Sequence, residues 1–170
     1  AMTLLYKYGF FKQEINDEDR QEELNDPWDY ENILTDTGKQ ATLYIRNTLI
    51  TLKIWKYEYT GESGHTVPIY FLDTHHKSNP DWAKELTEHL YVGDRIGQEL
   101  VLGIGGYRAL QALELDSIET YHMNEGHSAF LTLEMYRDLG VKTGTYEDAQ
   151  VEKKCVFTTH TPIPAGHDKF

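Results

Sequence analysis

The sequence is poor in the features that mark secreted, membrane-spanning and nucleic-acid-binding proteins. It has one cysteine, Cys155, so no disulfide can form within the chain and a reducing, cytoplasmic setting is expected. No apolar run approaches the ~20 residues that a membrane-spanning helix needs. Basic residues number 16 against 28 acidic ones, and the formal net charge of -12 opposes binding to phosphate backbones. These absences indicate a soluble protein that binds neither membranes nor nucleic acid.

Several catalytic signatures are missing as well. The sequence contains neither a Walker phosphate loop nor a Gly-x-Ser-x-Gly nucleophile elbow. Among the histidines, His122, His127, His160 and His167 lack the His-Glu-x-x-His spacing of a zinc-binding helix. No metal site is therefore expected.

Apart from these absences, the amino-acid composition is that of a folded domain. Hydrophobic residues make up 39% of the 170 residues and charged residues 26%, which suits a packed core. Residues 12–40 are polar and acidic, and they predict an exposed connection with helical pieces. Residues 41–72 alternate apolar and polar side chains around a Gly61–Gly64 turn, and they predict a β-hairpin or meander.

From residue 79 onward the pattern favours helices and then a parallel strand pair. Asn79 and Pro80 predict a capped helix start, and residues 94–113 predict a long helix whose glycines imply close approach by a neighbouring element. A strand at 117–121, helices over 126–154 and a strand at 155–158 predict a right-handed βαβ unit within the region 94–170. The buried stripe of its first helix is expected to include Phe130 and Leu133. We expect 1–170 to form a single, partial α/β domain.

Polar side chains follow both predicted parallel strands. In an open parallel sheet, ligands bind outside the carboxyl ends of the strands. This rule selects the segment 121–127, with His127, and the segment 158–162, with His160, so both histidines could face one crevice. Imidazoles with a carboxylate suit a polyhydroxylated ligand such as a sugar, whose hydroxyls need both donors and acceptors. Satisfied structural histidines remain the open alternative at this point.

Four segments then carry a family resemblance that covers nearly the whole chain. They resemble, in the same order, motifs of bacterial and archaeal α-glucan phosphorylases. These are Leu4-Leu5-Tyr6-x-Tyr8-Gly9, Asp94-Arg95-Ile96-x-Gln98-Glu99, Asn124-Glu125-Gly126-His127 and Phe157-Thr158-Thr159-His160-Thr161-Pro162.

The resemblance implies a GT-B architecture of two Rossmann-like domains, this chain being part of the N-terminal one. The implied reaction releases glucose 1-phosphate from α-1,4-glucans or maltodextrin with inorganic phosphate and pyridoxal 5′-phosphate. By motif position, His160 would bind the transferred glucose. Glu125 and His127 would line the neighbouring glucan subsite, and Asn124 would support them.

The family's glycine-rich phosphate loop and its cofactor lysine find no counterpart in this sequence. The stretch 91–95 is also shorter than the corresponding family loop. We therefore expect an internal fragment that is inactive alone, holds no complete catalytic set and binds no cofactor. Its open sheet would favour self-association or a complementing chain. The alternatives are a non-catalytic glucan-binding module, or a piece of a glycogen or starch synthase-like glycosyltransferase, although synthases carry Asp-Trp-His where this chain has Glu125-Gly126-His127.

Overall fold

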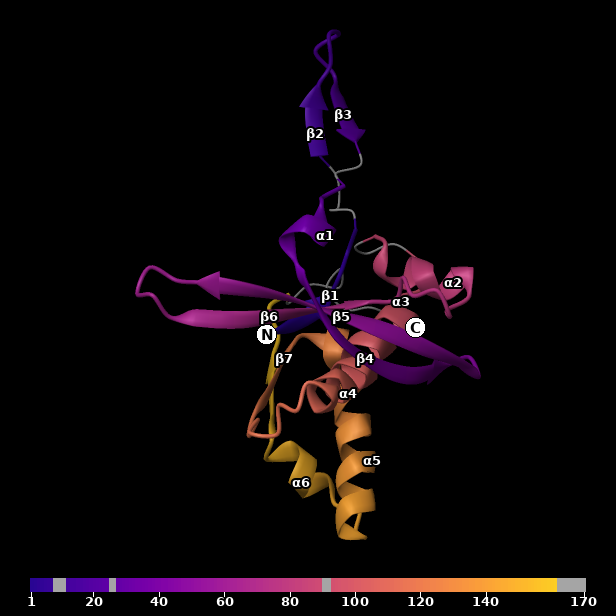
Figure 1. Cartoon of the computed structure of the whole chain (residues 1–170), viewed down its shortest axis with the longest axis vertical. Helices are drawn as coiled ribbons and strands as arrows, with labels where there is room; N and C mark the ends of the chain where they lie inside the picture. The colour runs from indigo at the N-terminus through magenta and orange to yellow at the C-terminus, as the bar shows by residue number, and fades with distance from the viewer. Residues whose placement is uncertain (8–11, 25–26, 90–92, 162–170) are drawn as a thin grey trace.

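The largest sheet has four strands in the order β1-β6-β5-β4. The computed structural model describes residues 1–7, 12–24, 27–89 and 93–161 (Figure 1). Strands β4 (Thr35–Ile45), β5 (Thr48–Thr60) and β6 (Thr66–Asp73) form an antiparallel meander, and β1 (Met2–Leu4) pairs with β6 in parallel. The meander predicted from the alternating pattern is confirmed, and it begins at Thr35.

One face of this sheet carries the main hydrophobic core. Leu43 lies opposite Ile50, Ala41 lies opposite Leu52, and all four side chains are buried. Each fully buried aliphatic side chain contributes about 1.5–3 kcal/mol relative to its exposed state. The alternation in the sequence thus places one set of side chains against the helices that cross this face.

The helix predicted over 94–113 is present as three joined pieces. These are α3 (Arg95–Leu100), the π-helical turn η2 (Val101–Gly105) and α4 (Gly106–Ala112). The helix begins where the Asp94 side chain accepts a hydrogen bond from the Gly97 N–H at 3.0 Å. A Cβ on Gly103 would lie 2.7 Å from the backbone nitrogen of Leu131, which confirms the close approach expected at these glycines.

A short helical segment precedes it, comprising α2 (Asp81–Lys84) and the 3₁₀ turn η1 (Glu85–Thr87). The expected cap at Asn79 is wrong, because Pro80 occupies the N-cap position. Asn79 is buried and donates instead to the carbonyls of Thr51 and Thr74, both at 2.7 Å. Over the residues placed by the structure, no helix is long and apolar enough to cross a membrane.

The predicted parallel βαβ unit is confirmed. Strand β7 (Tyr121–Asn124) is followed by η3 (Gly126–Ser128), α5 (Leu131–Thr143), α6 (Asp148–Glu152) and β8 (Cys155–Thr158), and β7 pairs with β8 in parallel.

Two details of this unit were predicted wrongly. Its first strand lies at 121–124 and not at 117–121, because Tyr121 and Met123 are the residues that pack into the cluster around Tyr107. On α5 the buried residues include Leu131 and Met135, whereas Leu133 is 60% exposed. Leu131 and Met135 are four residues apart on one face of α5, and Leu133 lies on another face.

The described residues of the acidic segment 12–40 are mostly exposed, as expected, except for the buried Leu34, but few of them are helical. Strands β2 (Lys12–Ile15) and β3 (Gln21–Leu24) form an antiparallel hairpin that projects from the body of the molecule (Figure 1). Asn16 closes its turn, since its side-chain oxygen accepts from the N–H groups of Glu18 and Arg20, both at 3.0 Å. The helical part is α1 (Tyr30–Ile33), a single turn.

Candidate functional site

The two predicted histidine-bearing segments do meet at one edge of the β7–β8 pair. Asn124 ends β7 and lies opposite Thr158, which ends β8, so the chain leaves both strands on the same side. Two residues further on, His160 Nε2 lies 2.6 Å from the side-chain oxygen of Asn124. Because that amide oxygen can only accept, Nε2 carries the proton and donates. Asn124 thereby fixes the orientation and tautomer of the His160 ring.

Glu125 ties the two strand ends together. Its Oε1 accepts hydrogen bonds from the backbone N–H groups of His160 at 2.7 Å and Thr161 at 2.8 Å, and its own N–H donates to the Thr158 carbonyl at 2.8 Å. The bond from the His160 N–H is the main influence that lowers the pKa of the Glu125 carboxyl, with Thr161 adding to it. Glu125 also has φ 59° and ψ −161°, a backbone conformation that non-glycine residues seldom adopt and that concentrates at functional sites.

Replacing Glu125 by glutamine should speed amide hydrogen exchange at His160 and Thr161 several-fold, because a neutral acceptor binds N–H groups more weakly than a carboxylate. Its lowered pKa means that the anchoring is fully present above the ordinary carboxyl pKa of 4.5 and is lost as the pH falls through the lowered value. Residue-resolved exchange by NMR measures the effect, with the exposed Glu119→Gln as control. Equal protection in both variants would show that Glu125 does not anchor this loop.

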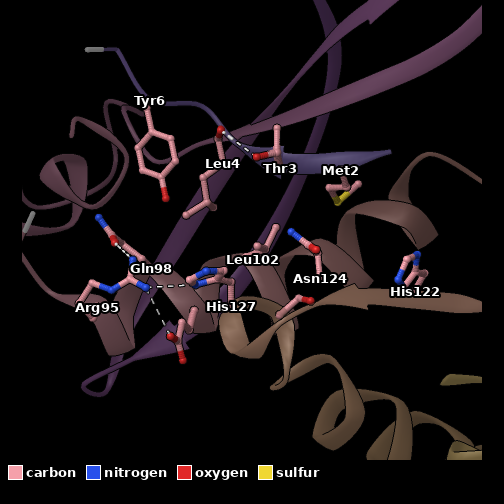
Figure 2. Close-up of a pocket in the computed structure, with 12 residues that line it drawn as sticks. Met2, Thr3, Leu4, Tyr6, Arg95, Gln98, Leu102, His122, Asn124 and His127 are labelled. Atoms are coloured by element: carbon pink, nitrogen blue, oxygen red, sulfur yellow. Dashed lines mark hydrogen bonds and ion pairs between the residues drawn. The ribbon is translucent and has the colours of Figure 1, made fainter. Parts of the chain in front are cut away.

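His127 lies in an adjacent cavity of about 250 Å³ between β1, α3 and β7 (Figure 2). Arg95 Nη2 is 3.1 Å from His127 Nδ1, and Arg95 also contacts Gln98 Oε1 at 3.1 Å and Glu99 Oε1 at 3.8 Å. Arginine has no acceptor, so His127 Nδ1 accepts and the ring proton of the neutral imidazole is on Nε2. Arg95 therefore orients His127 much as Asn124 orients His160.

The four predicted site residues thus divide into two groups. Asn124 and His127 line the cavity, whereas Glu125 and His160 lie at the neighbouring loop edge and do not line it. Asn124 links the groups, because it lines the cavity and holds His160.

Sequence reasoning missed most of the polar lining of this cavity. The residues concerned are Tyr6, Arg95, Gln98, Glu99 and His122. A usable signal existed in part of this set: Arg95, Gln98 and Glu99 have the i, i+3, i+4 spacing of one helix face directly after a capping Asp94. Gln98 and Glu99 are buried, which is unusual for such side chains unless they have partners or a function.

The arrangement offers both donors and acceptors to a ligand. Imidazole, guanidinium and carboxamide groups donate, while the carboxylate of Glu99 and the hydroxyl of Ser128 accept. A wall of this kind suits the hydroxyl groups of a sugar.

The described ranges show little that could hold a metal or a cofactor. They contain no group of three or more His, Cys, Asp or Glu side chains placed to bind a metal ion, and His167 lies outside them. Pyridoxal phosphate is held by a lysine Schiff base, and no lysine lines the cavity beside His127. This site therefore does not fit that cofactor by itself.

The cysteine shows no sign of activation. Cys155 is a free thiol within β8, and burial raises its pKa. A raised pKa disfavours the reactive thiolate, as expected for a structural cysteine.

Comparison with known proteins gives relatives that align along the whole chain. Glycogen phosphorylase of Mycobacterium tuberculosis (strain ATCC 25618 / H37Rv) is 35% identical over an alignment 188 positions long, which covers 100% of this chain and 21% of that protein. Maltodextrin phosphorylase of Thermococcus litoralis is 36% identical over an alignment 182 positions long, which covers 100% of this chain and 21% of that protein. Glycogen phosphorylase of Aquifex aeolicus is 31% identical over an alignment 175 positions long, which covers 96% of this chain and 24% of that protein.

No protein-family model matches the chain. The chain spans about a fifth of the length of the curated relatives it matches. These relatives are 31–36% identical to the chain and align with 96–100% of it. The chain therefore belongs to the α-glucan (glycogen and maltodextrin) phosphorylase family, and it corresponds to about a fifth of such a protein.

Proposed function

We propose that this chain supplies one wall of the glucan-binding crevice of an α-glucan phosphorylase. That enzyme releases glucose 1-phosphate from α-1,4-glucans with inorganic phosphate. The observation that carries the proposal is the His160–Asn124 hydrogen bond of 2.6 Å at the paired strand ends, beside the cavity of His127. The surrounding architecture would be the N-terminal Rossmann-like domain of a GT-B enzyme acting in the cytoplasm.

Each of the four residues then has a distinct task. His160, held in one tautomer by Asn124, accepts at Nδ1 a hydrogen bond from a hydroxyl of the glucose that is transferred. His127, oriented by Arg95, contacts the next glucan residue. Glu125 is a positioning residue, because its carboxylate holds the loop of His160 by two backbone N–H groups.

The cofactor chemistry lies with the rest of the enzyme. Bound pyridoxal phosphate would supply a phosphate group that exchanges a proton with the attacking phosphate, and its lysine would come from outside this chain. The residues of this chain bind and orient the sugar. The isolated chain is therefore inactive in phosphorolysis.

A graft tests the proposal directly. The segment of the Thermococcus litoralis maltodextrin phosphorylase that matches this chain would be replaced by residues 1–170, and release of glucose 1-phosphate from maltoheptaose would be measured. We expect phosphorolysis by the graft and none by the isolated chain. A folded graft that binds pyridoxal phosphate but releases no product would refute the proposal, as would turnover by the isolated chain.

A second candidate is a glucan-binding module without catalysis. It is favoured by the donors and acceptors that already line the cavity of about 250 Å³ within this chain, among them Arg95, Asn124 and His127. Glucan binding by the chain together with an inactive graft would select this reading.

A further inference from the structure

The turn between β4 and β5 carries an arginine in an uncommon backbone conformation. Ile45 pairs with Thr48 across the turn, so the turn consists of Arg46 and Asn47, and both residues have positive φ, 50° and 59°. Two-residue turns with positive φ at both positions favour asparagine, aspartate or glycine, and a bulky side chain there is an outlier. The turn itself therefore does not explain the arginine, whose reason must lie in its side-chain contacts.

The Arg46 side chain lies against the start of helix α3. Its Nη2 is 2.8 Å from Asp94 Oδ2, and its guanidinium carbon lies over the Trp82 ring, 5.4 Å from the ring centre. A cation at this distance from an indole face is attracted to the ring. Trp82 belongs to α2, so Arg46 connects the β4–β5 turn to both α2 and α3.

Asp94 carries this contact into α3. Its Oδ1 caps the helix by accepting from the Gly97 N–H at 3.0 Å, and its Oδ2 forms the ion pair with Arg46. Among the described residues, Oδ2 is buried without a well-aligned hydrogen-bond donor, so the guanidinium compensates its charge. A Cβ on Gly97 would lie 2.7 Å from Oδ2, so a side chain at this position would displace the carboxylate. The place of the Asp94 carboxylate is thus determined from two sides.

The next residue of α3 holds His127. Arg95 directly follows the capping Asp94, and its Nη2 lies 3.1 Å from His127 Nδ1. Figure 2 shows the Arg95 guanidinium directed at the His127 ring within the cavity. The place of Arg95 depends on where the first turn of α3 begins, and a displacement of ~1 Å would break a hydrogen bond of this length.

We propose that Arg46 and Asp94 are positioning residues for the glucan subsite of His127. Their ion pair fixes the start of α3, and Arg95 thereby holds the His127 ring with Nδ1 as the acceptor and Nε2–H as the donor. Neither Arg46 nor Asp94 lines the cavity, so both act through Arg95 and not on the sugar. The effect on glucan binding rests on the proposed function, whereas the effect on His127 can be measured without sugar.

Two substitutions remove the ion pair while keeping the local backbone. Arg46→Asn places in the turn a residue that favours positive φ, and Asp94→Asn keeps a side-chain oxygen for the helix cap. Arg46→Lys keeps the charge and should restore part of the wild-type behaviour. The matched control is Lys39→Ala, which breaks the 3.1 Å ion pair between Lys39 of β4 and Glu114, the second residue after α4. That pair also connects β4 to the helical segment but involves neither α3 nor His127.

The side-chain nitrogen signals of His127 test the positioning in the ¹⁵N-labelled chain without ligand. At about pH 8, where an ordinary imidazole is neutral, we expect the wild-type signals of a single tautomer with the proton on Nε2. In Arg46→Asn and in Asp94→Asn they should shift towards the averaged signals of a ring that exchanges between tautomers. The double variant should match each single variant, because both act through one contact. Unchanged His127 signals in both single variants would overturn the inference, and so would an equal shift in Lys39→Ala.

The kinetics of the same variants in the graft test the consequence for glucan binding. We expect KM for maltoheptaose to rise about 3- to 10-fold while kcat changes less than about twofold, because His127 contacts a glucan residue that is not itself transferred. Lys39→Ala should leave both constants unchanged. Unchanged KM in an active graft would overturn the positioning role. An inactive graft would count against the proposed function alone, and the His127 signals then decide whether the ion pair positions the ring.

Discussion

Replacing Glu134 by alanine should lower the free energy of unfolding by about 2–3 kcal/mol, because it leaves two arginines without their partner. The side chain of Glu134 is buried, at 4% exposure. Arg108 of α4 binds it through two hydrogen bonds of 2.7 and 3.1 Å, and Arg137 binds Oε1 at 2.6 Å. Arg108 also donates to the Thr42 carbonyl at 2.8 Å, so the cluster connects α5, α4 and β4.

This stabilisation should depend on pH in a defined direction. Burial raises the pKa of the Glu134 carboxyl, but hydrogen bonds from Arg137 and Arg108 outweigh burial, and the net pKa is lowered from 4.5. A lowered pKa in the folded state contributes stability above the unfolded-state pKa and loses it as the pH falls through the folded value. Urea denaturation at pH 7 and pH 3 measures the effect, with the exposed Glu152→Ala as control, which should change stability by less than about 0.5 kcal/mol. Equal losses in the two variants at pH 7 would show that the cluster does not stabilise the fold.

Replacing His160 by alanine in the active graft should lower kcat/KM for phosphorolysis by about 10- to 100-fold, since one or two hydrogen bonds to the sugar are lost. The loop itself should keep its place, because Glu125 holds the backbone N–H of residue 160 and not its imidazole. Steady-state rates with maltoheptaose measure the change. The adjacent, exposed Thr159→Ala is the matched control and should retain activity. Unchanged kcat/KM in His160→Ala would exclude His160 from the site.

Elements with a clear apolar pattern were predictable from the sequence. The apolar/polar alternation over residues 41–72 predicted the meander, and the apolar residues Val156 and Phe157 next to Cys155 predicted β8 correctly. The hairpin of β2 and β3 was missed, because its residues are all exposed and its pairing depends on the Asn16 turn and not on an apolar pattern. The start of β7 was misplaced because pairing with β8 and burial of Met123, which are tertiary effects, decide it.

The site was predictable in outline only. The strand-end rule selected the segments of His127 and His160, and the family resemblance named Asn124; the structure adds the 2.6 Å bond between Asn124 and His160. The role of Glu125 depends on a positive φ and on N–H groups 35 and 36 residues away, which no local pattern reveals. The part of the phosphorylase-like motif beyond Thr161 lies outside the described residues, as do residues 91–92 of the short stretch 91–95 and Tyr8-Gly9 of the first motif.

Titration of the ¹⁵N-labelled chain with maltoheptaose, followed by NMR, tests the glucan-binding wall most directly. We expect saturable shifts at Asn124, His127 and His160, with an affinity that falls at least tenfold in His160→Ala and stays unchanged in Thr159→Ala. An absence of shifts at these three residues up to millimolar sugar, or binding that His160→Ala leaves intact, would contradict a sugar site at the ends of β7 and β8.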